Sequence, residues 1–156
     1  MRILLSLVAL LAAGCGPALD VAAALRLESV STGWVDLGRV GESNKLVPAI
    51  EFTVKNASDR TLAPIHVNAV FRREGDASEW TNGMVTAAGS AGLPPAAETP
   101  KLVIKGAVGY TGTDAQWDLL QNSHFVDATV DVFARYGARQ WTRVGEYRVA
   151  RRIIER

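Results

Sequence analysis

Two histidines and a spaced pair of aspartates are the residues best suited to metal binding or acid–base catalysis. A zinc or copper site needs three or four converging ligands, and only His124 and Asp127 stand close together in sequence. The alternating pattern places His66, Asp127 and Asp131 on outward strand faces. Acid–base catalysis needs one carboxylate of a pair to be desolvated, and an outward face exposes both aspartates to solvent. We therefore expect no metal site, no cofactor and no catalytic pair.

Motifs for nucleophilic catalysis and phosphate binding are also missing from the sequence. No nucleophile elbow of the type G-x-S-x-G occurs. The stretch GYTGT at 109–113 has spaced glycines, but no lysine follows the second one. Asn56-Ala57-Ser58 matches a glycosylation sequon, yet it lies in NASDRT, a cluster of turn-forming residues. The sequence predicts a non-enzymatic protein, with a hydrolase of unrecognised type as the alternative.

Aromatic residues are the stronger candidates for binding. Trp34 and Trp80 stand in glycine-bounded segments, STGWVDLG and SEWTNG. With Tyr110 they are predicted to form an exposed contact surface that stacks on sugars or anchors a partner protein. Partial burial at the ends of a sheet is the alternative. Trp117 and Trp141 are predicted to lie in the core.

The charge is balanced overall but uneven along the chain. The 17 basic and 16 acidic residues give a formal net charge of +1, which argues against a general nucleic-acid binder. From Arg135 to Arg156, however, seven arginines face only Glu146 and Glu155. This segment is either a solvated strand face or a docking patch for an anionic partner, such as lipid headgroups or an acidic protein. The candidate patch consists of Arg143, Arg148, Arg151 and Arg152.

The amino terminus reads as an export signal. Arg2 supplies a positive charge, residues 3–11 form a short apolar run, and small residues follow up to Gly14. The run is shorter than the roughly 20 residues that a membrane-spanning helix needs. We therefore assign residues 1–14 to a signal peptide. Cys15, the one cysteine of the sequence, follows immediately, and a free thiol there would invite wrong disulfides in an oxidising compartment.

The segment Leu11-Ala12-Ala13-Gly14-Cys15 resembles the lipobox of bacterial lipoproteins, although Ala12 occupies the place where leucine is usual. The resemblance implies cleavage before Cys15, diacylation of its thiol and acylation of the new amine, which would anchor the protein permanently. By the same resemblance, Gly16 rather than aspartate implies an outer-membrane lipoprotein that faces the periplasm or the cell surface. A plain secretory signal with an incidental cysteine is the alternative.

The mature sequence is dominated by a period of two. Ile50, Phe52 and Val54 alternate with polar residues, as do the apolar positions of 65–71 and 126–132, with Val126 on the inward side. Further strands are expected within 25–30, 79–87, 101–106 and 139–153, which makes about seven. One short helix is expected, with Thr113 and Gln116 at capping-box spacing and its end near 122–123.

Short strands with one polar and one apolar face can bury their apolar faces when two antiparallel sheets pack against each other. We predict a single all-β, immunoglobulin-like sandwich over residues 25–156, preceded by a lipidated tether over 15–24. The run VKNASDRTLAPIHVNAVFRREG resembles bacterial Ig-like envelope domains of the FxLYD type, with LPPA at 93–96 in place of their later Leu-x-Pro-Gly. That resemblance implies the fold and carries over no catalytic residue.

Together these features predict an envelope lipoprotein that binds or supports another protein in the periplasm. A module that binds a glycan or a peptidoglycan fragment through exposed aromatic residues is the alternative.

Overall fold

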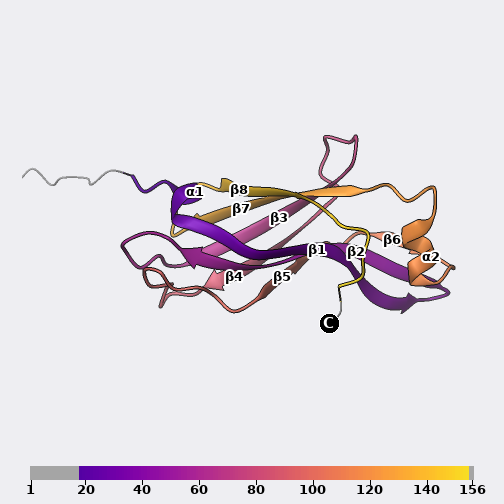
Figure 1. Cartoon of the computed structure of the whole chain (residues 1–156), viewed down its shortest axis with the longest axis horizontal. Helices are drawn as coiled ribbons and strands as arrows, with labels where there is room; N and C mark the ends of the chain where they lie inside the picture. The colour runs from indigo at the N-terminus through magenta and orange to yellow at the C-terminus, as the bar shows by residue number, and fades with distance from the viewer. Residues whose placement is uncertain (1–17, 155–156) are drawn as a thin grey trace, which may run out of the picture.

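The computed structural model describes residues 18–154, which form an elongated sandwich of two antiparallel sheets (Figure 1). In one sheet, β1 (Leu25–Val40), β2 (Ser43–Asn56) and β5 (Leu102–Lys105) pair in that order, and β6 (Tyr110–Gly112) also pairs with β2. The other has the order β4 (Thr81–Ala88), β3 (Ile65–Arg73), β7 (Ala128–Tyr136) and β8 (Thr142–Arg148). The predicted all-β sandwich is confirmed, with eight strands rather than about seven.

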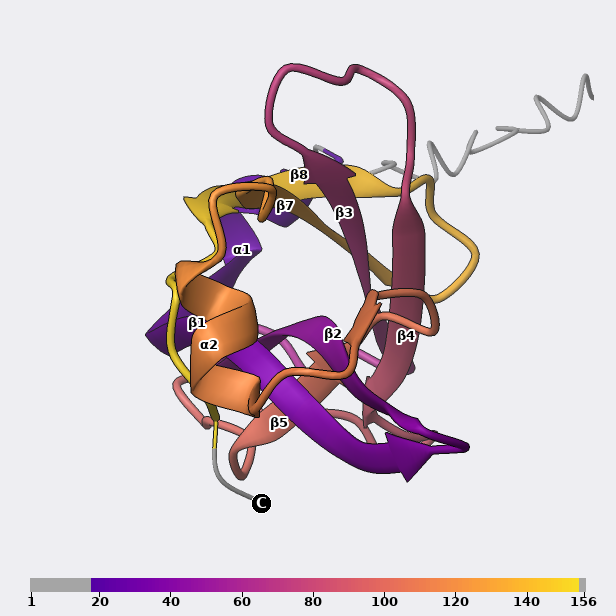
Figure 2. The ribbon, with the colours of Figure 1, turned by 90° about the vertical axis from the view of Figure 1, so that its right-hand side faces the viewer.

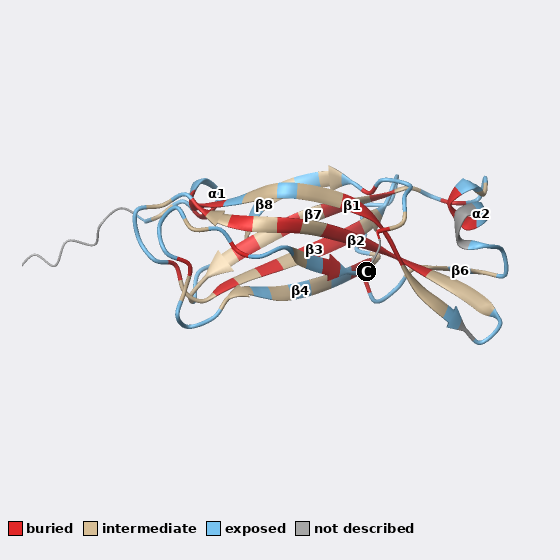
Figure 3. Ribbon diagram, turned by 60° about the horizontal axis from the view of Figure 1, so that its bottom comes forward, coloured by how far each residue is buried: buried red, intermediate tan, exposed pale blue. Residues whose placement is uncertain are grey.

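The inward faces of the strands build the main core, which appears as buried stripes along them (Figure 3). Val35, Val47, Ala49 and Ile154 form a second, smaller buried cluster. Because successive strand residues point to opposite faces, the apolar positions of the alternating segments meet between the sheets. The predicted inward residues Ile50, Phe52 and Val54 are fully buried. Val126 is the exception: it precedes β7 and is 40% exposed, so its predicted inward place is wrong.

The predicted tether extends too far into the folded body. Residues Val21–Ala24 form a short helix, α1, whose first turn is capped by the Asp20 side chain, which accepts a hydrogen bond from the Ala22 N–H. Val21 and Ala24 are buried in the core. Packing of these small apolar residues against the sheets orders the segment that composition alone suggested was a linker.

A second helix, α2 (Gln116–Gln121), lies where the sequence predicted one. Its N-cap is Ala115, and no side chain caps it, so the predicted capping box of Thr113 and Gln116 is wrong. The side chain of Trp117 is not among those described. No helix within residues 18–154 is long and apolar enough to cross a membrane.

The two helices mark opposite ends of the body. We call them the α1 end and the α2 end (Figures 1 and 2). At the α1 end, the Ala57 backbone N–H donates to the Ala24 carbonyl, and residues 138–140 share a groove with residues 18–21. At the α2 end, β6 pairs with the start of β2, and the Asn44 side chain donates to the carbonyl of Asp114.

Candidate functional site

The three aromatic residues predicted to act together do meet, at the α2 end. The ring centroids of Trp34 lie 6.1 Å from Trp80 and 5.6 Å from Tyr110, and those of Trp80 and Tyr110 are 5.1 Å apart. Phe125 completes the cluster, 4.7 Å from Trp34 and 4.6 Å from Tyr110. Phe125 was not predicted to belong to this cluster, because its position at the start of a predicted strand gave no indication of the contact.

Trp34 cannot be part of a contact surface, because it is fully buried. It lies in β1 between β2 on one side and the C-terminal segment 152–154 on the other. The backbone N–H of Trp34 donates to the Arg152 carbonyl, and the Trp34 carbonyl accepts from the backbone N–H of Ile154, both at 2.8 Å. This segment, more than 115 residues away in sequence, pairs with the edge of β1, and the Trp34 ring itself packs in the core against Trp80, Tyr110 and Phe125. Trp80 and Tyr110 are partly exposed.

Beside the cluster lies a small pocket. Its volume is about 130 Å³, and its lining consists of Tyr110, Thr111, Leu119, Asn122, His124 and Phe125. The Tyr110 hydroxyl donates to the Val126 carbonyl at 3.0 Å. The Asn122 side-chain oxygen accepts a hydrogen bond from the backbone N–H of His124 at 2.9 Å. Apolar walls and a few polar groups thus converge on one opening at the α2 end.

Arg151 holds this pocket in place. Its guanidinium donates to the carbonyls of Leu120 in α2 and Phe125, at 3.2 and 3.1 Å, and to Asp127 Oδ1 at 2.6 Å. It also lies 5.1 Å from the centroid of the Phe125 ring. One cation from the C-terminal segment therefore ties α2 and the loop before β7 to the sandwich.

Asp127 is shared by two arginines. Arg148 donates to its second oxygen at 2.9 Å and to Glu74 at 3.1 Å. The hydrogen bond from Arg151 is the largest cause that holds the pKa of Asp127 below its ordinary value, and the bond from Arg148 acts in the same direction against the effect of burial. Asp127 thus links two arginines as a shared carboxylate.

Most of the predicted basic docking patch is paired with carboxylates. Arg148 and Arg151 are paired as above, and Arg143 contacts Asp131 at 2.7 Å and also Glu146. Arg152 donates to the Thr32 carbonyl at 2.8 Å and to the Ser31 hydroxyl. Folding thus pairs three of the four arginines with carboxylates, whereas Arg152 donates only to neutral oxygens.

The remaining sequence candidates lie apart from one another. The His66 ring lies 3.3 Å from the Thr86 hydroxyl on the outer face of the β3–β4 pair, whereas His124 lies at the α2 end. Within residues 18–154, no group of three or more histidine, cysteine or acidic residues could hold a metal ion. Cys15 lies outside the described residues.

No protein-family model matches the sequence, and no curated protein matches it. One similar solved structure is described as the X-ray structure of Northeast Structural Genomics Consortium target SoR45. It is 13% identical, the alignment covers 84% of this chain and 89% of that one, and the TM-score is 0.47. The function of this chain must therefore be inferred from its own residues.

Proposed function

We propose that this protein is a bacterial envelope lipoprotein that is anchored through Cys15 and acts as a non-enzymatic accessory module. Its α2 end binds a partner protein. The anchor is proposed from the lipobox-like sequence, and an outer-membrane location from Gly16. The binding role is proposed from the aromatic cluster and its pocket.

The position of the body on its anchor supports this role. Cys15 precedes Asp20 by five positions, and five residues span at most about 17 Å even when fully extended. A lipid on Cys15 would therefore hold the α1 end beside the bilayer. The α2 end lies at the other extreme of the elongated body (Figure 1), where a partner can reach it.

The size of the pocket favours a protein partner and is the observation that carries the proposal. Small-molecule sites usually enclose roughly 300–1,000 Å³, whereas this pocket encloses about 130 Å³. A cavity of about 150 Å³ is sufficient for a benzene molecule. The pocket thus matches one apolar side chain, and protein interfaces are commonly anchored by one side chain in such a pocket.

Site-specific photo-crosslinking in intact cells tests the proposal. A photoreactive residue at Thr111, which lines the pocket, is expected to give a defined product with another envelope protein, and the same residue at Thr86, on β4, is not. The pocket-filling substitution His124→Trp should abolish that product, while the matched His66→Trp should leave it. Absence of any product from Thr111, or a product indifferent to His124→Trp, would contradict the proposal.

A glycan or peptidoglycan-fragment module is the second candidate, because Trp80 and Tyr110 remain partly exposed at the same end. Stacking of a sugar on Trp80 should shift its fluorescence, and Trp80→Ala should remove the shift. An unchanged spectrum with peptidoglycan fragments would leave the protein-binding role as the one supported.

A further inference from the structure

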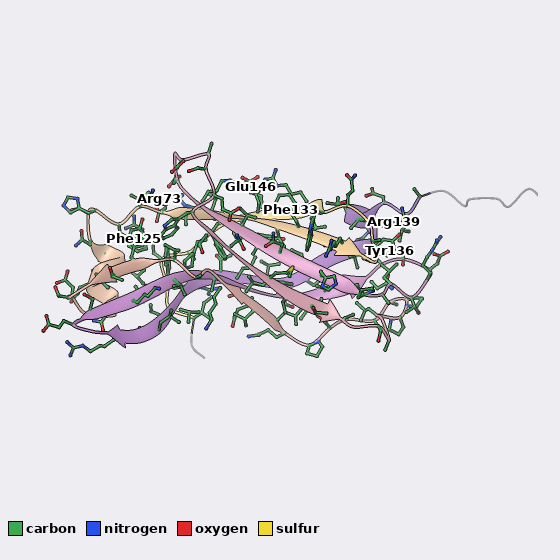
Figure 4. All side chains as sticks on the ribbon, turned by 180° about the vertical axis from the view of Figure 1, so that it is seen from behind. Arg73, Phe125, Phe133, Tyr136, Arg139 and Glu146 are labelled. Carbon is green, nitrogen blue, oxygen red and sulfur yellow. The ribbon has the colours of Figure 1, made fainter. Side chains whose placement is uncertain are left out.

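The turn between β7 and β8 carries two arginine–aromatic pairs at the α1 end. The Arg135 guanidinium carbon lies 4.6 Å from the ring centroid of Trp141, and that of Arg139 lies 5.3 Å from the ring centroid of Tyr136. Figure 4 shows Tyr136 and Arg139 toward the α1 end, with Phe125 at the opposite end. Trp141, predicted to lie in the core, is 36% exposed. It precedes β8 and stacks on the arginine instead.

These two arginines differ from Arg143, Arg148 and Arg151, which are paired with carboxylates. Within the described structure, neither Arg135 nor Arg139 forms an ion pair with a carboxylate, and Arg135 Nε is buried without a hydrogen-bond partner. Asp20, the acidic group at the start of α1, is engaged as the helix cap. This surface therefore carries two arginines that form no ion pair with a carboxylate within the described residues.

The same turn lies beside residues 18–21, the first residues that the structure describes. Residues 18–21, together with Ala138, Arg139, Gln140 and Thr142, line a groove of about 500 Å³. With at most about 17 Å of chain between Cys15 and Asp20, a bilayer that holds the anchor cannot be far from this turn.

We propose that the β7–β8 turn surface (Arg135, Tyr136, Arg139 and Trp141) docks on anionic lipid headgroups. This inference rests on the proposed lipid anchor at Cys15. Arginine attracts an anionic membrane surface, and tryptophan and tyrosine prefer the interface between headgroups and acyl chains. Tethering makes the contact intramolecular, so a weak surface is sufficient. An acidic protein is the other possible occupant, but the anchor brings lipid to this turn in every molecule.

The test uses the full-length lipidated protein in vesicles of phosphatidylcholine and phosphatidylglycerol that contain a dibrominated lipid. Docking should quench Trp141, and Trp141→Phe identifies its share of the signal. Each arginine contributes roughly a fivefold preference for an anionic surface. Arg135→Gln/Arg139→Gln should therefore lower the ratio of docked to undocked molecules about 25-fold. The control Arg39→Gln/Lys45→Gln removes the same charge from the α2 end and should leave the quenching unchanged.

The outcomes separate the two proposals. Mass spectrometry of the membrane-extracted protein first establishes whether Cys15 carries lipid. An unmodified thiol would overturn the proposed function and, with it, this inference. A lipidated protein whose Trp141 is not quenched, or whose quenching responds equally to both double variants, would overturn the docking surface alone. Photo-crosslinks from position 138 to an acidic protein and not to lipid would also overturn it.

Discussion

Replacement of Asn56 by alanine should destabilise the protein by about 3 kcal/mol. The Asn56 side chain is fully buried at the end of β2 and uses its whole hydrogen-bonding capacity. Its amide group donates to the carbonyls of Arg60 and Leu93, each at 2.8 Å. Its oxygen accepts from the N–H and the hydroxyl of Ser58, at 2.9 and 2.6 Å.

The magnitude follows from these four bonds. Each contributes about 0.5–1.5 kcal/mol net, which bounds their sum between about 2 and 6 kcal/mol. The Leu93 carbonyl also accepts from the Leu62 N–H, and the Arg60 carbonyl from the Ser58 hydroxyl. Because both carbonyls keep one partner, we place the loss near 3 kcal/mol, a large fraction of the roughly 5–15 kcal/mol stability of a typical domain.

Urea denaturation, followed by tryptophan fluorescence, measures this change. Ser58→Ala serves as the control and should cost about 1 kcal/mol, since it removes the bonds of one hydroxyl. Asn56→Asp keeps the shape and the two accepted bonds but turns a second oxygen toward the two carbonyls. At neutral pH it should therefore destabilise at least as much as alanine. A loss below about 1 kcal/mol for Asn56→Ala, at an unchanged slope with urea, would refute the reasoning.

Three further predictions concern Arg151, its partner Asp127, and Gly33, which packs against the C-terminal segment. Arg151→Gln should reduce the hydrogen-exchange protection of α2 much more than Arg148→Gln, because only Arg151 binds the carbonyls at that end; equal effects would contradict its role. Because the pKa of Asp127 is lowered, its carboxylate stabilises the fold above its unfolded pKa of about 3.9, and the stabilisation is lost as the pH falls through its folded pKa. The stability gap between the wild type and Asp127→Asn should be constant from about pH 7 to 5 and close at lower pH, and unfolding curves at pH 6 and pH 3 check this. Gly33→Ala would place a methyl group 2.8 Å from the Arg152 carbonyl oxygen and from Ile154 Cγ1. It should make the C-terminus sensitive to carboxypeptidase, whereas Gly89→Ala, with no atom within 4 Å, should not.

Local patterns in the sequence predicted the architecture because strand formation leaves a local signal. The alternation of Ile50, Phe52 and Val54 identifies the inward face of β2 without knowledge of any partner strand. The same holds for Val130 and Val132 in β7, and both segments are buried as expected. The position of α2 could likewise be predicted. The residue that caps it could not, since capping depends on the backbone conformation adopted at that point.

The sequence by itself also determined which residue types were available for binding, namely a few aromatic side chains and an excess of arginine near the C-terminus. Only the tertiary structure decided which of them are free. Arg151 donates a hydrogen bond to Asp127, which lies 24 positions earlier in the sequence. Trp34 pairs through its backbone with a segment about 118–120 positions away. Arg135 stacks on Trp141 and forms no ion pair with a carboxylate in the described structure. Composition records how many charges and rings a segment holds, but the burial and neutralisation of each depend on partners that only long-range strand pairing brings together.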